Sequence, residues 1–178
     1  QNDLRYEIIV YNDGSVDNTV EILKKLKSRL KSFYYINNDN NRGYGYGMKK
    51  AIQKANGVYL VTIDSDNQYK IENLKNFFFI FDSPLLCVTG HREKKKDSFI
   101  KVLADNVLKR IIKLLFKTKL KDTNCALKMI HKDVIKKIII ESNDYCFPSE
   151  VCLRIENEKI QIADVPIQLS FREGGRSA

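Results

Sequence analysis

The sequence lacks several features that mark specialised classes of protein. Its four cysteines (Cys87, Cys125, Cys146 and Cys152) form no Cys-x-x-Cys pair, so their spacing gives no zinc site, and we expect buried thiols in a reducing compartment. The sequence contains no run of about 18 apolar residues, the length needed to cross a bilayer, and no signal peptide opens it. We therefore expect the chain as given to be soluble. No repeat, low-complexity segment or linker divides the 178 residues, a length that suits one domain.

Positive charge is concentrated in one part of the chain. The whole sequence has 31 basic and 22 acidic residues, a net charge of +9. The stretch 92–137 holds 15 basic and 5 acidic residues, a net of +10, and the remainder has 16 and 17, a net of −1. This favours an anionic partner or, equally, a solvated lysine-rich surface. The only aromatic residues in the stretch 92–137 are Phe99 and Phe116. Two are too few to form a platform on which bases stack, so we do not expect nucleic-acid binding.

Hydrophobic periodicity predicts alternating strands and helices. Strands are expected over residues 6–11, 33–36, 58–63, 85–89 and 160–169, and helices after residue 17 and over 48–55, 71–81, 98–117 and 134–140. Residues 37–47, rich in Asn and Gly, are expected to form a loop. Pro166 points to an edge or irregular position for the last strand. The alternation predicts an α/β fold with a doubly wound, mostly parallel sheet.

The predicted helix 98–117 is basic and amphipathic. Its apolar positions are Phe99, Leu103, Val107, Ile111, Leu114 and Leu115, and its basic positions are Lys101, Lys109, Arg110, Lys113 and Lys117. Such a helix either lies in an anionic membrane interface or packs on a sheet with its charges solvated. We expect most of the apolar side chains to pack against the sheet.

Polar residues follow two of the predicted strands directly. The cluster 12–15 ends the first strand, and Asp64 and Asp66 end the third. Ligands of open α/β sheets bind beyond the carboxyl ends of the strands, so both clusters should share one edge. Two carboxylates two residues apart suit magnesium or manganese, with Gln68 as a further oxygen ligand, although a polar turn remains an alternative.

Three alternating glycines precede the helix expected at 48–55. Gly43, Gly45 and Gly47 could let backbone N–H groups approach a phosphate or a sugar closely, or could form a flexible turn. The segment lacks the Lys-Ser/Thr ending of a P-loop and the G-x-G-x-x-G spacing of a dinucleotide site.

Taken together, these motifs resemble glycosyltransferase family 2, which has the GT-A fold. The residues that carry the resemblance are 10–19, 41–45, 55–57 and 64–68. Further pieces resemble the polyprenyl-phosphate (dolichol-phosphate) mannosyl- or glucosyltransferase branch. They are 90–92, Asp122 with Lys128, Glu150, 165–167 and 172–177.

The resemblance implies transfer of a hexose from a GDP-mannose- or UDP-glucose-type donor to a polyprenyl or dolichyl phosphate, with inversion. The implied donor-binding residues are Asn12, Asp13, Gly43, Gly45, Asp64, Asp66 and Arg172, with Asp64, Asp66 and Gln68 holding a magnesium or manganese ion. Arg92 and Ser177 are implied at the acceptor phosphate, Arg172 and Ser177 in a closing C-terminal loop, and Asp66 and Arg92 as catalytic residues. The metal and arginine would neutralise the leaving diphosphate.

The family normally begins with a further strand and helix and continues beyond the equivalent of Ala178 into interfacial or transmembrane helices. We therefore expect residues 1–178 to be a single catalytic domain, truncated at both ends and weakly active or inactive alone, at the cytoplasmic face of a membrane. Two alternatives stay open: transfer to a saccharide hydroxyl, with Asp122 or Glu150 as the base, and a catalytically impaired remnant.

Overall fold

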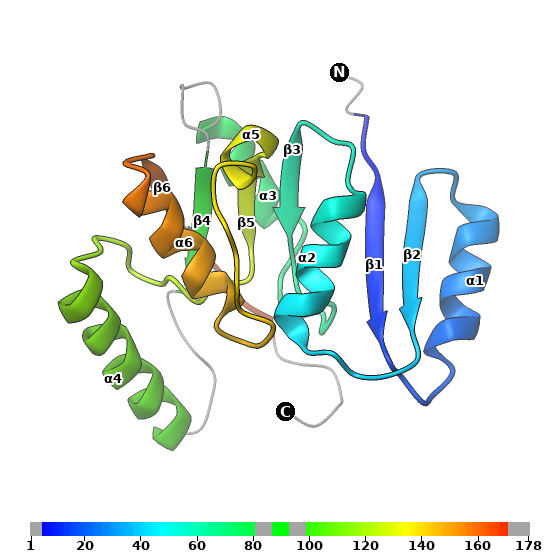
Figure 1. Cartoon of the computed structure of the whole chain (residues 1–178), viewed down its shortest axis with the longest axis horizontal. Helices are drawn as coiled ribbons and strands as arrows, with labels where there is room; N and C mark the ends of the chain where they lie inside the picture. Colours follow the sequence, from blue (N-terminus) through cyan, green and yellow to red (C-terminus); the bar gives the residue numbers. More distant parts are fainter. Residues whose placement is uncertain (1–4, 81–86, 93–98, 171–178) are drawn as a thin grey trace.

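The computed structural model describes residues 5–80, 87–92 and 99–170 (Figure 1). The strands are β1 (Ile8–Asp13), β2 (Phe33–Asn38), β3 (Tyr59–Thr62), β4 (Cys87–Arg92), β5 (Lys128–His131) and β6 (Ile162–Ile167). The helices are α1 (Thr19–Arg29), α2 (Tyr44–Lys54), α3 (Asn73–Ile80), α4 (Phe99–Phe116), α5 (Lys132–Ile135) and α6 (Phe147–Asn157). The predicted α/β architecture is confirmed.

The strands form two sheets. β1 and β2 pair in parallel, and a four-stranded sheet has the order β3-β5-β4-β6. β4 and β6 are parallel, whereas β5 runs antiparallel to both of its neighbours. β3, β4 and β6 therefore point the same way, and their carboxyl ends share one edge. Pro166 lies on the edge strand β6, as its missing N–H group predicts.

Among the described residues no ladder joins β1 to β3, although Figure 1 shows the two strands pointing the same way in neighbouring sheets. Polar contacts connect the sheets instead. At one end, the Glu7 carboxylate accepts hydrogen bonds from the N–H groups of Asn56, at 2.5 Å, and Gly57, at 2.9 Å. At the other, the first turn of α2 spans from Asp13 to Asp64.

The core covers both faces of the four-stranded sheet. Alternate residues of a strand point to opposite faces. Val88 of β4 therefore packs in one cluster with Phe77 of α3, and Cys87 packs in another with Val151 of α6. Figure 1 shows α6 in front of this sheet and α3 behind it. The expectation of buried free thiols is confirmed for Cys87, Cys125 and Cys152, whereas Cys146 is exposed.

Four elements differ from the sequence-based expectation. α2 begins at Tyr44, inside the segment expected to be a loop, because glycine-rich composition does not reveal a first turn that tertiary contacts stabilise. β5 and α6 were not predicted, since a lysine interrupts the apolar run of β5 and charged residues are scattered through α6. The helix expected over 134–140 ends already at Ile135, and Ile138 and Ile140 pack against the core outside regular helix.

The prediction that α4 packs its apolar side on the sheet is wrong. Leu103, Val107, Ile111, Leu114 and Leu115 are all exposed. Figure 1 shows α4 at the periphery of the molecule, apart from both sheets. The amphipathic pattern correctly predicted the helix, but periodicity specifies only which residues share a face and not which face meets the protein.

Candidate active site

Asp64 and Asp66 lie just beyond β3, at the carboxyl edge of the sheet. The Tyr44 hydroxyl donates a hydrogen bond to Asp64 Oδ1 at 2.9 Å, and the Gln68 N–H donates to Asp66 Oδ1 at 3.2 Å. Burial raises the pKa of Asp64; the bond from Tyr44 lowers it, and the adjacent charge of Asp66 raises it. The net shift is upward, chiefly because burial disfavours the ionised form of the Asp64 carboxylate.

Tyr44 was missed as a site residue by the sequence analysis. Burial and the nearby Asp64 charge both raise the pKa of Tyr44 above its ordinary value, so its hydroxyl remains a donor. Its ring stacks on Tyr145, with centroids 5.8 Å apart, and meets Phe147 edge-on. The sequence did offer one indication, because Tyr44 alternates with the glycines that were singled out.

Asn12 and Asp13 lie together at the end of β1, as predicted, and organise the adjoining loops. The Asp13 carboxylate accepts hydrogen bonds from the N–H groups of Arg42, at 2.7 Å, and Gly43, at 2.9 Å. Buried Asn12 donates to Asn37 Oδ1 at 2.8 Å, and its own Oδ1 accepts from the Ser15 hydroxyl. The two side chains thus shape the rim of the site; contact with a nucleoside stays a prediction.

Gly43 and Gly45 pack directly against the backbone of residues 142–144. Gly43 has φ +97°, and a Cβ there would collide with the Asn143 carbonyl. At Gly45 a Cβ would lie 2.6 Å from the Ser142 carbonyl oxygen. The Tyr46 N–H donates to the Asn143 carbonyl at 3.1 Å in the same contact. Close packing therefore accounts for both glycines, and their role in donor binding remains a prediction.

We expect Gly45→Ala to lower the free energy of unfolding by about 1–3 kcal/mol, because the new methyl group overpacks a backbone–backbone contact. This loss outweighs the roughly 1 kcal/mol that alanine gains over glycine in a helix. Urea unfolding followed by circular dichroism measures the change. The exposed α2 variant Gln53→Ala is the control and should stay within about 0.5 kcal/mol of the parent. An equally stable Gly45→Ala protein would contradict the packing described.

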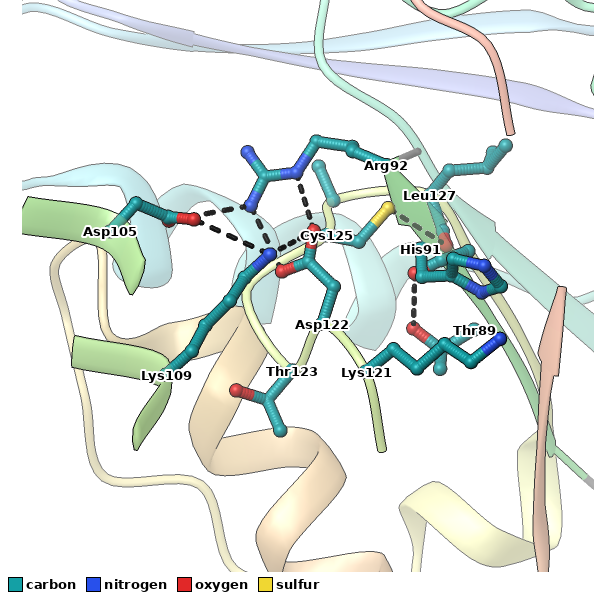
Figure 2. Close-up of polar contacts among 12 residues, drawn as sticks. Thr89, His91, Arg92, Asp105, Lys109, Lys121, Asp122, Thr123, Cys125 and Leu127 are labelled. Carbon is teal, nitrogen blue, oxygen red and sulfur yellow. Dashed lines mark hydrogen bonds and ion pairs between the residues drawn. The ribbon is translucent and has the colours of Figure 1, made fainter. Parts of the chain in front are cut away.

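Arg92, at the end of β4, forms the centre of a buried ionic cluster (Figure 2). Its Nε and Nη2 donate to the two Asp122 oxygens at 2.6 and 2.9 Å. Asp122 is only 1% exposed. On α4, Asp105 lies 3.8 Å from Arg92 Nη2, and Lys109 Nζ lies 3.3 Å from Asp105 and 3.5 Å from Asp122. Burial opposes the charge of Arg92, but Asp122 outweighs it, and the net effect raises the pKa of Arg92.

The segment 118–127, which carries Asp122, is pinned from several sides. One Asp164 oxygen contacts His91 Nδ1, and the other accepts from the Lys121 N–H at 2.6 Å. The Thr62 hydroxyl donates to the Ala126 carbonyl at 2.6 Å. These contacts fix Asp122 relative to the ends of β3 and β4.

Lys128 on β5 is buried to 1% exposure and fully engaged. Its ammonium donates to Thr89 Oγ1 and the Thr123 carbonyl, both at 3.1 Å, and to the Cys125 carbonyl at 2.5 Å. A buried cation needs such a complete set of acceptors. In the sequence, Lys128 is part of the family resemblance only, although a lysine inside an apolar run already indicates a buried polar contact.

The structure brings the two halves of the predicted site together. The charges of Arg92 and Lys128 both act on Asp64, lowering its pKa. Asp64, just beyond β3, and Arg92, at the end of β4, therefore lie near one another at the same sheet edge. The Ser170 N–H donates to the Gln68 carbonyl at 2.8 Å, so the chain after β6 lies against the Asp66 loop. The predicted residues Arg172 and Ser177 lie outside the described residues.

The residues at Asp64 and Asp66 fit a divalent cation in their chemistry. Magnesium is usually held by one or two carboxylates together with substrate phosphates. The raised pKa of Asp64 indicates negative charge that a cation would balance. A group of three or more His, Cys, Asp or Glu side chains placed to hold a metal does not occur among the described residues, so substrate oxygens would have to complete such a site.

Comparison with known proteins gives the family. The glycosyl transferase family 2 model matches residues 1–139. The chain is 23% identical over 188 residues to dolichyl-phosphate beta-glucosyltransferase ALG5D of Trichomonas vaginalis, covering 98% of this chain and 58% of that protein. It is 34% identical over 102 residues to poly-beta-1,6-N-acetyl-D-glucosamine synthase of Staphylococcus aureus, covering 53% of this chain and 23% of that protein. The predicted resemblance to the dolichol-phosphate branch is confirmed.

Solved structures give the fold. Glucosyl-3-phosphoglycerate synthase of Mycobacterium tuberculosis, in complex with Mn²⁺, uridine diphosphate and phosphoglyceric acid, superposes with a TM-score of 0.72 at 12% identity. The match covers 95% of this chain and 61% of that one, and it confirms the predicted GT-A fold. With the family model spanning more than two thirds of its residues, the chain belongs to glycosyl transferase family 2.

Proposed function

We propose that this chain provides the catalytic centre for transfer of a hexose from a nucleoside-diphosphate sugar to a polyprenyl phosphate, with inversion. The observation that carries the proposal is that the charge of Arg92 acts on Asp64 at the sheet edge that also carries Asp66, while Lys109 belongs to the same ionic cluster as Arg92. A carboxylate pair suits a cation and diphosphate, and adjacent guanidinium and ammonium groups suit a second phosphate.

On the donor side, Asp64 and Asp66 would hold magnesium or manganese, with Gln68 beside them. The bound cation would supply charge neutralisation for the departing nucleoside diphosphate. Asn12 and Asp13 would form the wall of the nucleoside site through the loops that they fix. Gly43 and Gly45 would allow close approach of the donor at the start of α2, and Arg172 would cover the diphosphate.

On the acceptor side, a phosphate needs little help from a base because it is already an anion. Asp122 and Glu150, the two carboxylates considered as the base for a hydroxyl acceptor, already accept hydrogen bonds within the protein. Asp122 is paired with Arg92. Glu150 accepts from the N–H groups of Glu141 and Ser142 and from Arg154; burial opposes its charge, but these bonds prevail and lower the pKa of Glu150. Arg92 and Ser177 would orient the acceptor phosphate.

A lipid acceptor places the reaction at a membrane surface, which we propose to be the cytoplasmic face. Among the residues that the structure describes, no helix is long and apolar enough to cross a bilayer. The chain spans 58% of the length of the Trichomonas relative, so activity of the chain alone is part of the proposal.

A second candidate is transfer to a saccharide hydroxyl, favoured by the 34% identity to the Staphylococcus synthase over 102 residues. The decisive experiment offers the chain radiolabelled UDP-glucose or GDP-mannose with either a short polyprenyl phosphate or an oligosaccharide. Because we expect the chain alone to have little activity, we expect weak, cation-dependent label in the lipid phosphate that EDTA abolishes. Label in the oligosaccharide would establish the second candidate instead. Calorimetry with UDP and GDP, with and without Mn²⁺, tests whether the chain retains a donor site. A catalytically impaired remnant would bind neither nucleotide.

As the pH is lowered, cation-dependent nucleotide binding should be lost. The loss should occur at a higher pH than it would if the cation were held by an ordinary aspartate, whose pKa is about 3.9. The pKa of Asp64 is raised by burial, and a cation binds its ionised form, so binding is retained above that pKa and lost as pH falls through it. Tyr44→Phe removes a bond that stabilises the ionised form. We expect it to move the loss of binding to higher pH. Calorimetry over a series of pH values tests this, with Tyr46→Phe as the control; identical profiles for the two variants would refute it.

A further inference from the structure

The loop 139–146, between α5 and α6, is anchored to two helices. Figure 1 shows it passing beside the start of α2. From α2, the Lys49 ammonium donates a hydrogen bond to the Glu141 carbonyl at 3.0 Å. From α6, the Glu150 carboxylate accepts from the N–H groups of Glu141 and Ser142 at 2.9 and 2.8 Å. The backbone of this loop is therefore held in place by the protein itself.

The anchored loop presents a single aromatic side chain, Tyr145, which is 66% exposed. Its ring stacks on that of Tyr44, with centroids 5.8 Å apart and an angle of 20° between the planes. In a stacked pair each ring covers one face of the other, so the second face of Tyr145 is left open. Buried Phe147 meets the Tyr44 ring edge-on and supports it. The three rings thus form an ordered aromatic surface with one open face.

Tyr44 connects this aromatic surface to the carboxylate pair. Its hydroxyl donates to Asp64 Oδ1 at 2.9 Å, so Tyr145 lies one aromatic ring away from a carboxylate proposed to hold the cation. The nucleoside end of the donor is proposed to lie at Asn12 and Asp13, beyond the other end of the same turn of α2. A ring beside Asp64 is therefore suited to the opposite end of the diphosphate, to which the hexose is attached.

We infer that the open face of Tyr145 packs on the C–H face of the transferred hexose and contributes to recognition of the sugar. Sites for small molecules are lined by aromatic side chains together with a few polar groups. A tyrosine ring offers a large, rigid contact surface at a low cost in conformational entropy. This inference rests on the proposed function, because the cation and diphosphate at Asp64 and Asp66 bring the hexose to the ring. It adds a residue that distinguishes a sugar nucleotide from the nucleotide alone.

The test is calorimetry with Mn²⁺ and two pairs of ligands, UDP-glucose with UDP and GDP-mannose with GDP. Tyr145→Ala should weaken binding of the sugar nucleotide about fivefold, as expected for the loss of one aromatic contact. It should leave binding of the nucleoside diphosphate within about twofold of the parent. Tyr145→Phe keeps the ring and should bind both ligands like the parent.

Tyr6→Ala is the matched control and should also bind both ligands like the parent. Tyr6 is 66% exposed, as Tyr145 is, but it precedes β1 and lies at the opposite end of that strand from Asp13. Tyr145→Leu is a second test variant, because it keeps an apolar cover over Tyr44 without a flat ring. It should show the same selective loss as Tyr145→Ala. Urea unfolding confirms that each variant is folded.

Unchanged binding of the sugar nucleotide by Tyr145→Ala and Tyr145→Leu overturns the inference and leaves the proposed function intact. An equal loss for the sugar nucleotide and the nucleoside diphosphate also overturns it, since the ring would then act on the nucleoside or on Asp64 through Tyr44. A parent chain that binds none of the four ligands refutes the proposed donor site, and the inference with it.

Discussion

Asp66→Asn should weaken manganese-dependent binding of a nucleoside diphosphate at least about hundredfold. The substitution removes one of two adjacent carboxylates but keeps a side-chain oxygen able to accept from the Gln68 N–H. A hard cation depends strongly on ligand charge, and even changes to groups behind its ligands cost about 10–100-fold in affinity. Asp64→Asn should have an effect of the same size, because it removes the other carboxylate of the pair.

Calorimetric titration with UDP and GDP measures this effect, and omission of Mn²⁺ gives the cation-independent baseline. Asp133→Asn is a matched control, since that carboxylate is 64% exposed and pairs only at the surface. The urea midpoint of Asp66→Asn should equal that of the parent, which separates lost binding from lost folding. Affinity within twofold of the parent would remove Asp66 from the proposed cation site.

Arg92→Met should lower the free energy of unfolding by about 3 kcal/mol. Asp122 is almost wholly buried and receives two hydrogen bonds from Arg92. Removing one partner of a buried pair leaves an uncompensated charge, which typically costs about 3–5 kcal/mol. Lys109, 3.5 Å from Asp122, should limit the loss toward the lower end of that range.

The double variant Arg92→Met/Asp122→Leu should recover much of this stability, because replacing both charges leaves no buried ion unpaired. Urea unfolding of the parent, both single variants and the double variant completes the thermodynamic cycle. Lys136→Met, from an exposed pair with Asp133, serves as the surface control and should change stability by less than about 1 kcal/mol. Strictly additive losses at Arg92 and Asp122 would show that the two residues do not stabilise one another.

Local sequence was sufficient for the features that contiguous residues encode. An apolar run followed directly by Asp64 and Asp66 placed a carboxylate pair at a strand end, and the structure has it there. Asn12 and Asp13 were expected to follow the first strand for the same reason, and they are the last two residues of β1. Strand β5 escaped prediction because it begins with Lys128, whose charge is stabilised in the core only by Thr89 and by the carbonyl groups of two residues that precede it.

The sequence by itself determined the alternation of strands and helices, the amphipathic character of α4 and the polar residues that end β1 and β3, since each depends on neighbours along the chain. Only the tertiary structure decided that Tyr44 meets Asp64, that Arg92 pairs with Asp122 thirty residues away, and that α4 turns Asp105 and Lys109 inward. Periodicity fixes which side chains share a face of a helix. The partners that folding brings to a helix decide which of its faces meets the protein. For α4 those partners are the buried carboxylate of Asp122 and the guanidinium of Arg92.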